Sequence, residues 1–410
     1  MQINKIMKKI SILGLCLSVG LTMSAQVDQL KEVERAVKSG NFNYAEVKAK
    51  IADITANPET KDDVKAWMVA GEASFAHYDA LFLKLQMGQE VDKKEMGHAI
   101  IDGYSYMIKA LPLDSLPDKK GKIKTRNSNK ILKSIAENYS HYNNAGVFLW
   151  EAEDYSGAYD AWNIYVNLPQ DSRMGKTGLI ADADSVVSQI IFNQALALWQ
   201  LDDLNQALDA FEKAYNKGYQ KKNLFDYAIS VATQLQKGDI ASKYAKIAYP
   251  IYGNEDPVYL QVIVNDYLEK KDFANAKEFL NGLLATNPTS AQYNDLMGVL
   301  LENEGSQEDA LNMYRKAVEL NPQMAIARFH LGNLLYNKAY AIDNEASSKS
   351  QAEYEKIRSE QTEPLLREAA AQLEEAFKLD EQNMGDALKH LKNIYYILGD
   401  EENLNRVNLM

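Results

Sequence analysis

The stretch AQYNDLMGVLLENEGSQEDALNMYRKAVELNP, residues 291–322, reads as two amphipathic helices joined by a turn. Gly298 in the first helix and Ala310 in the second carry no side chain that would hold two packed helices apart. Gly305 lies between them, where the chain must turn. Pro322 closes the unit, because proline cannot continue a helix and suits the first turn of the next one. The stretch therefore predicts a helix–turn–helix unit.

The same pattern recurs along the chain. Ala207, Ala241, Ala276 and Ala310 are 34, 35 and 34 residues apart, and each lies inside an amphipathic helical pattern. A unit of this size cannot bury its own apolar faces, so it stacks on its neighbours into a solenoid with a long concave surface. Runs of alternating β-branched residues are missing, which predicts an all-α fold without a sheet.

These units resemble the tetratricopeptide repeat family, whose repeats have a small residue, an alanine, an aromatic ring, a second alanine and a proline at fixed positions. In residues 291–322 the five positions hold Gly298, Ala310, Tyr314, Ala317 and Pro322. Earlier units hold Ala195, Ala207, Phe211 and Ala214, with Tyr219 for the proline, and Gly146, Ala158 and Trp162, with Tyr165 for the second alanine. The units around Ala241 and Ala276 depart from the pattern, with Ile229 in the first and Val264 and Leu283 in the second at small positions. The resemblance covers roughly residues 139–322 and implies an α-solenoid with a right-handed superhelical twist.

Both ends follow the pattern more loosely, so we predict four regions: a signal peptide over 1–25, degenerate helical repeats over 26–138, core repeats over 139–322 and C-terminal repeats over 323–410. Gly332 lies 34 residues after Gly298, but the matching second helix, with Ala369, Leu373 and Ala376, comes late. The polar segment 341–363 between them contains neither glycine nor proline, which predicts lengthened helices that project beyond the stack. The last residues, 387–408, read as a terminal helix pair.

The N-terminus has the pattern of a secretory signal. Lys5, Lys8 and Lys9 precede an apolar stretch over 10–21, and Ala25 supplies a small residue before the expected cleavage site. An uncleaved anchor stays open as an alternative, whereas lipidation of Cys16 is disfavoured because Leu15 precedes it. Since Cys16 is the only cysteine, an exported mature chain would have no disulfide, which favours a bacterial periplasmic or outer-membrane-associated protein.

Charge and motifs argue against catalysis, cofactors and nucleic acid. Loss of the three signal lysines would change the formal net charge from −12 to −15, and such a chain repels phosphates. Gly175-Lys176-Thr177 lacks the earlier glycine of a phosphate loop, since position 170 is Gln, so 169–184 reads as an inserted loop. The five histidines are scattered, and Asp182 and Asp184 lack the rest of a calcium loop. We therefore expect no enzyme, metal or cofactor.

A basic segment stands out on this acidic chain, with Lys119, Lys120, Lys122, Lys124, Arg126 and Lys130. It is either a solvated loop between repeats or a docking patch for an anionic partner, and peripheral attachment to a membrane stays open with it. No segment after the signal has the length and apolarity to cross a bilayer.

The resemblance also implies a partner site, because the first helices of tetratricopeptide repeats line the concave groove. On this register the groove side chains include Asn143, Trp150, Phe192, Trp199, Asp226, Asn265, Asp295, Phe329, Asn333 and Tyr336. Aromatic rings mixed with amides suit an extended peptide or a helix. A helix of the chain itself could instead fill the groove. Tetratricopeptide proteins that clamp the acidic C-terminus of heat-shock chaperones have a lysine at one groove position. Gln261 and Phe329 occupy that position here, so this subtype is excluded.

These observations predict a non-enzymatic protein–protein interaction scaffold of the bacterial cell envelope, which binds a peptide or partner helix in its groove. The alternative is a glycan- or nutrient-binding component of an outer-membrane uptake system, some of which resemble this chain in carrying tetratricopeptide helices. A third reading, an enzyme with a helical substrate tunnel, is disfavoured by the missing motifs.

Overall fold

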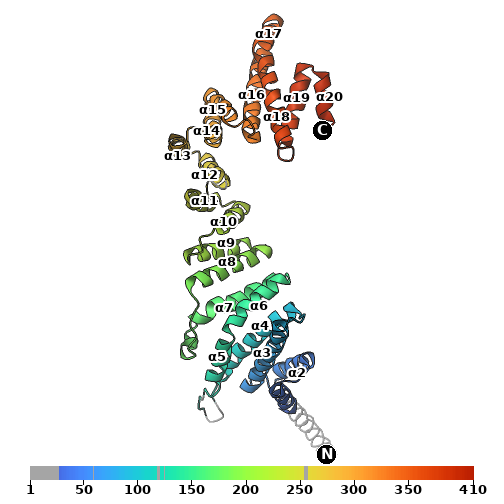
Figure 1. Cartoon of the computed structure of the whole chain (residues 1–410), viewed down its shortest axis with the longest axis vertical. Helices are drawn as coiled ribbons and strands as arrows, with labels where there is room; N and C mark the ends of the chain where they lie inside the picture. Colours follow the sequence, from blue (N-terminus) through green and yellow to red (C-terminus); the bar gives the residue numbers. More distant parts are fainter. Residues whose placement is uncertain (1–26, 59, 118–120, 124, 254–256) are drawn as a thin grey trace, which may run out of the picture. The chain divides into compact units, whose positions relative to one another are not determined.

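The computed structural model describes residues 27–58, 60–117, 121–123, 125–253 and 257–410 (Figure 1). The predicted signal segment 1–25 lies outside them. Within these residues all regular structure is helical, and the single β-bridge, between Pro117 and Ile123, stands alone. The predicted all-α class is therefore confirmed. None of the helices in the described part of the chain is long and apolar enough to cross a membrane.

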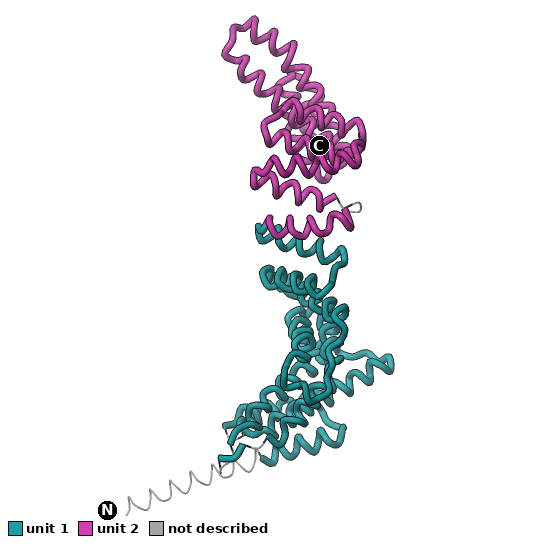
Figure 2. Tube along the Cα trace, turned by 90° about the vertical axis from the view of Figure 1, so that its left-hand side faces the viewer, with its two compact units in different colours: residues 1–237 teal, residues 238–410 magenta. Residues whose placement is uncertain are grey.

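The chain divides into two compact units, residues 1–237 and 238–410 (Figure 2). In unit 1, residues 27–39 are helical and precede α2 (Tyr44–Ala56), α3 (Val64–Gln86), α4 (Lys93–Leu113), α5 (Ser128–Glu137), α6 (Tyr139–Glu151), α7 (Tyr155–Asn167), the 3₁₀ turns η1 (Leu168–Gln170) and η2 (Ser172–Lys176), α8 (Asp184–Gln200), α9 (Leu204–Asn216) and α10 (Lys222–Gln234).

Unit 2 contains α11 (Gly238–Tyr252), α12 (Val258–Glu269), α13 (Phe273–Thr286), α14 (Ala291–Glu304), α15 (Gln307–Leu320), α16 (Ala325–Ala346), α17 (Gln351–Ile357), the π-helical turn η3 (Arg358–Thr362), α18 (Glu363–Leu379), α19 (Gly385–Leu398) and α20 (Glu401–Asn408). In both units consecutive helices pack as pairs, such as α8 with α9 and α14 with α15.

Small residues let the paired helices meet. A Cβ atom built on Gly298 of α14 would lie 2.5 Å from Cδ1 and Cε1 of Tyr314 on α15. The ring of Trp162 on α7 covers Gly146 of α6 in the same way. The alanines of the 34-residue register are almost entirely buried, as are the aromatic rings that follow them. The positions singled out by the sequence pattern are thus the ones where helices touch.

The turns inside successive pairs share one conformation. Glu153, Asp202 and Lys271 have φ of 57°, 59° and 54°, in the left-handed region that side chains other than glycine rarely adopt. Gly305 fills the same place after α14, with φ of 92°. In each turn the next backbone N–H reaches back into the first helix, as Asp203 N does to Leu198 O at 2.9 Å, and so satisfies a terminal carbonyl. One turn geometry therefore serves both units.

The late second helix of the last long pair is α18. Leu373 of α18 packs on Gly332 of α16, where an added Cβ would lie 2.7 Å from Leu373 Cγ. The intervening segment forms the end of α16, then α17 and η3, and runs back as an extended hairpin at one end of unit 2 (Figures 1 and 2). Arg358 anchors the hairpin by donating from Nη2 to the Ile397 carbonyl of α19 at 2.5 Å.

Candidate interaction surface on the first helices

The surface predicted to bind a partner lies on the first helix of each pair: α6 and α8 in unit 1, and α12, α14 and α16 in unit 2, with α10 at the end of unit 1.

In unit 1 this surface contains an apolar pocket of about 250 Å³. Its walls are Val147 and Trp150 of α6, and Asn193 and Leu196 of α8, with Trp162 of α7 as the fifth lining residue. Val147 is 40% exposed and Trp150 is half-buried, so an incoming side chain could touch both without displacing the core. We name this feature the Trp150 pocket.

Ring packing fixes the shape of the Trp150 pocket. The indole of Trp150 lies edge-on to Tyr155, with centroids 5.0 Å apart, and 6.3 Å from the ring of Trp162. Trp162 is buried against Gly146, and its Nε1 has no hydrogen-bond partner among the described residues. The walls are therefore held in place before any ligand arrives, which reduces the entropy lost on binding.

The sequence missed part of this pocket. It placed Trp150 at a groove position but assigned Trp162 to helix packing only, and it did not single out Asn193 or Leu196. Leu196 directly follows the small residue Ala195 of the repeat, so the helical register alone places it beside the contact between helices.

The other predicted groove side chains of unit 1 are buried, half-buried or paired with neighbouring residues. Phe192 is 3% exposed, because its ring stacks on Tyr219 at 4.5 Å and packs on Phe211 at 5.8 Å. The predicted place of Phe192 on an open groove is therefore wrong. Trp199 is half-buried, 5.2 Å from Tyr227, while Asp226 forms an ion pair with Lys222 at 3.0 Å and Asn143 is half-buried.

In unit 2, Asp295 is buried as well, at 3% exposed, and lies 2.9 Å from Nδ1 of His330. It belongs to the interior network of α14 and α16, and its predicted place on an open groove is wrong. Asn265 of α12 is exposed and Asn333 of α16 is half-buried. Whether the exposed and half-buried positions bind a partner stays a prediction.

An aromatic cluster lies on α16 and α19. Phe329 and Tyr336 of α16 pack on His390 of α19, with ring centroids 6.2 and 5.1 Å apart. Tyr340 extends the row and is 59% exposed. Burial lowers the pKa of His390, which favours a neutral imidazole at neutral pH. His390 and Tyr340 were not predicted, because the delayed α18 hides the pairing of α16 with α19 from a 34-residue register.

The basic segment is only partly described. Lys119, Lys120 and Lys124 lie outside the described residues, Lys122 and Arg126 are exposed, and Lys130 pairs with Glu72 at 2.6 Å. Asp114 closes the loop. Its carboxylate accepts hydrogen bonds from the backbone and side chains of Asn127 and Ser128, at 2.7 to 2.9 Å. These bonds lower the pKa of Asp114 against the opposing effect of burial.

The aspartates at the end of the inserted loop and the histidines His77 and His98 each pair with a different residue and do not gather at one site. Asp182 accepts from Tyr165, and Asp184 pairs with Lys217 at 3.0 Å. His77 meets Glu95 at 3.0 Å and His98 meets Asp154 at 2.8 Å. In the part of the chain that is described, no three His, Cys, Asp or Glu residues gather as a metal site would need.

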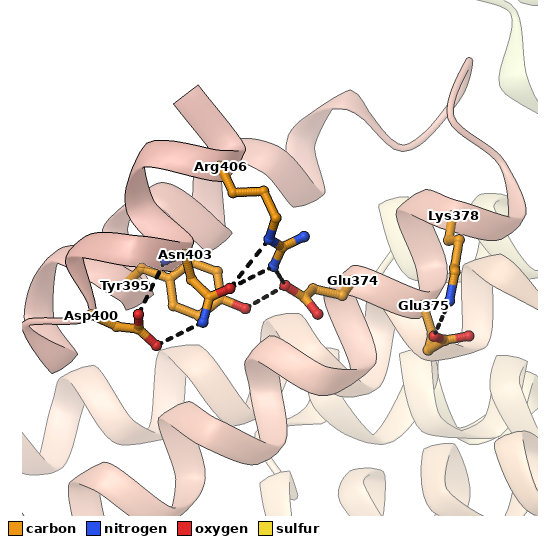
Figure 3. A network of polar contacts seen from close by, with 7 residues as sticks. All are labelled: Glu374, Glu375, Lys378, Tyr395, Asp400, Asn403 and Arg406. Carbon is orange, nitrogen blue, oxygen red and sulfur yellow. Dashed lines mark hydrogen bonds and ion pairs between the residues drawn. The ribbon is translucent and has the colours of Figure 1, made fainter. Parts of the chain in front are cut away.

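A further pocket, of about 350 Å³, lies among α18, α19 and α20. Four of its charged groups form pairs: Glu374 accepts from Arg406 and, at 2.5 Å, from the Tyr395 hydroxyl, and Glu375 lies 3.0 Å from Lys378. Beside the pocket, Asp400 accepts from Asn403 at 2.8 Å (Figure 3). This network ties α20 to α18 and α19, so we interpret the pocket as a packing feature.

Helix pairs with small residues at their crossings and a row of side chains on the first helices define a class, the α-solenoid repeat proteins. Residues 298–338 match a family model described as "TPR repeat", and residues 188–216 match one described as "Tetratricopeptide repeat". The chain is a tetratricopeptide repeat protein.

Solved structures with similar folds were also found. A monomeric mutant of IFIT1 with Gppp-AAAA is 12% identical over 82% of this chain and 68% of its own, with a TM-score of 0.39. A tetratricopeptide repeat protein from Parabacteroides merdae is 13% identical over 62% and 98%, with a TM-score of 0.36. YrrB, described as a TPR protein with an unusual peptide-binding site, is 16% identical over 63% and 94%, with a TM-score of 0.30. No curated protein matches this chain.

Proposed function

We propose that this protein is a non-enzymatic interaction scaffold of the bacterial cell envelope, which binds a peptide or helix of a partner protein on its first-helix surface. The repeats support the role of an interaction scaffold, because the tetratricopeptide fold is generally a non-catalytic interaction fold. The Trp150 pocket supports the proposal that a peptide or helix binds on the first-helix surface. It is an apolar, preformed recess on the face where the family binds its partners, and large aromatic side chains dominate binding energy at such sites.

The chemistry of the pocket favours an apolar anchor side chain of the partner. Val147, Trp150 and Leu196 offer apolar contact, and Asn193, whose Oδ1 accepts from Gln189 at 3.2 Å, offers its Nδ2 as a donor. A segment that lays a leucine or an aromatic ring in the recess would bury apolar surface, while Asn193 could pair with its backbone. The acidic chain makes nucleic acid an unsuitable ligand.

A displayed library of random peptides, selected on the full mature chain, tests this function. We expect selected peptides to share an apolar anchor residue and to bind the Trp150→Ala variant about thirtyfold more weakly. Leu83→Ala is the matched control, because Leu83 is an exposed apolar side chain of unit 1 that does not line the pocket. Equal binding to Trp150→Ala and wild type would contradict the proposed site, and failure to select any peptide would contradict peptide binding.

The envelope setting has its own test. We expect the mature protein, isolated from its native cell, to begin at Gln26 and to fractionate with the periplasm or outer membrane. A chain that keeps residues 1–25 in the cytoplasm would contradict export without affecting the peptide experiment.

A further inference from the structure

A second pocket, of about 170 Å³, lies between α7 and α9 above α8. Ile191, Gln194 and Leu198 of α8 form its floor. At 100° of rotation per residue, these side chains lie on the face of α8 opposite to Asn193 and Leu196, which line the Trp150 pocket. The two pockets are therefore separate sites of unit 1.

The floor holds a polar group with no partner. Gln194 is 6% exposed, and its side-chain amide forms no hydrogen bond with another described residue. Its amide atoms are not among the fully enclosed side-chain atoms that lack a partner, so they open into the pocket, where water or a ligand can pair with them. Because Gln194 lines the pocket, its donor and acceptor atoms are available to a molecule inside it.

The walls add further polar atoms without a net charge. Asn167 Nδ2 of α7 donates to the backbone oxygen and to Oδ1 of Asn163, at 2.9 and 2.7 Å, which leaves Nδ2 of Asn163 as a donor and Oδ1 of Asn167 as an acceptor. Asp209 and Lys213 of α9 lie at the exposed rim, have opposite charges and form no ion pair with another described residue. The pocket thus suits a neutral ligand with several groups that both donate and accept hydrogen bonds.

The remaining surface is apolar. Ile191, Leu198, Val166 and Ala210 lie beside the amides, and the half-buried ring of Tyr159 stands at the α7 side. A sugar ring has the matching division: hydroxyl groups around its edge and C–H groups on its faces. The volume, roughly that of six water molecules in the liquid, limits the ligand to a single ring.

We propose that this second pocket binds one neutral sugar residue, either free or at the end of a glycan, with Gln194 as its central hydrogen-bonding group. The inference goes beyond the proposed scaffold function and does not depend on it. A scaffold with a sugar site on the second-helix side could bind its protein partner and a glycan at the same time.

Saturation-transfer difference NMR on the full mature chain tests the site, with D-glucose, D-galactose, D-mannose and N-acetyl-D-glucosamine as probes. We expect transfer to the ring protons of at least one sugar. The Gln194→Met variant keeps the side-chain volume and removes the amide, and should weaken that sugar about three- to tenfold. Gln200→Met is the matched control, because Gln200 is an exposed glutamine of the same helix that lines neither pocket.

Each other outcome overturns the proposal. Absence of transfer from every sugar would show that the pocket holds only water, and an unchanged sugar affinity in Gln194→Met would place the sugar elsewhere. Binding of a blocked dipeptide in place of the sugars would show an amide site. If Gln194→Met does not fold, Asn163→Ala, at an exposed position of the wall, replaces it, and unchanged sugar binding in that variant would equally refute the site.

Discussion

Two repeats share one sequence pattern but differ in the residues that pack where their helices cross. One is formed by α8 and α9 in unit 1, and the other by α14 and α15 in unit 2. The tetratricopeptide models match most of each repeat. In α8 and α9 the small residue is Ala195 and the ring is Phe211, whereas α14 and α15 combine Gly298 with Tyr314. The tyrosine hydroxyl donates to Glu302 at 2.8 Å, and the phenylalanine has no polar group to satisfy.

This difference shows what the pattern conserves in physical terms. The crossing tolerates an alanine or a glycine according to how closely the opposite ring approaches, and here the ring of Tyr314 leaves no room for a Cβ on Gly298. The pattern therefore fixes the combined volume at the crossing rather than either residue. Polar atoms brought in by a larger ring need a partner of their own, and Glu302 serves that purpose.

The largest effect should come from Ala310→Trp. Ala310 is fully buried where α14 and α15 meet, and a bulky ring there would force the helices apart. We expect a loss of about 3 kcal/mol or more in the free energy of unfolding, measured by urea denaturation. Ala207→Trp in the α8–α9 repeat should match it, since Ala207 is also fully buried. An unchanged melting temperature in either variant would show that the register is wrong.

Gly298→Ala should have the next largest effect on stability, and it tests whether the two helix crossings are equally tight. The added Cβ would lie 2.5 Å from the Tyr314 ring, so we expect a loss of about 1–3 kcal/mol. The reverse change, Ala195→Gly in α8, creates no overlap and should lose only about 0.5–1 kcal/mol, through backbone entropy. Hydrogen exchange of the helices in each repeat would measure both. Equal effects would mean that the two crossings are equally tight.

Alkaline pH should weaken the α14–α15 repeat through Tyr314, which has no counterpart in Phe211. Burial and the neighbouring Glu302 raise the pKa of Tyr314 well above its usual range. Below the pKa of the unfolded state, near 10, both states are protonated and the stability is complete. Above it only the unfolded chain releases the proton, so stability falls by about 1 kcal/mol between pH 10 and 11. The Tyr314→Phe variant should lack this part of the pH dependence, and identical alkaline denaturation curves would refute the assignment.

The smallest effect concerns the turns. Asp202 in the α8–α9 turn adopts the left-handed conformation with φ of 59°, and Gly305 adopts it in the α14–α15 turn. Asp202→Gly should stabilise the protein by about 0.5 kcal/mol, because glycine adopts this conformation without steric strain. Gly305→Asp should destabilise it by a similar amount. Differential scanning calorimetry would resolve the pair, and shifts of the same sign would contradict the shared turn geometry.

The sequence predicted the helix pairs because the repeat places its small and aromatic residues at the contacts themselves. It predicted the turn at Gly305 but not the equivalent turns of the other pairs. Glu153, Asp202, Gln236 and Lys271 carry no glycine signal, although the last three stand 34 and 35 residues apart and Gly305 continues the series after another 34. Aligning the units on Gly305 would have revealed the turn position.

The candidate site was harder to predict, because exposure depends on neighbours that the register does not contain. Phe192 occupies a groove position, yet Tyr219 and Phe211 enclose it. Asp295 is covered because His330 of the next first helix reaches it. A helical register gives the direction of a side chain, but what meets it there is decided by the size of residues one repeat away.

The Asp114 closure has a practical consequence for anyone who wishes to label this protein. Asn127 and Ser128, at the start of α5, are hydrogen-bonded to Asp114 at the end of α4, so the two ends of the basic loop are joined directly. Lengthening a loop whose ends are already joined is inexpensive, at about 0.6 kcal/mol for each doubling. A small fluorescent tag or an epitope inserted between Gly121 and Lys122 should therefore leave both pockets of unit 1 intact, and would let the protein be followed in living cells.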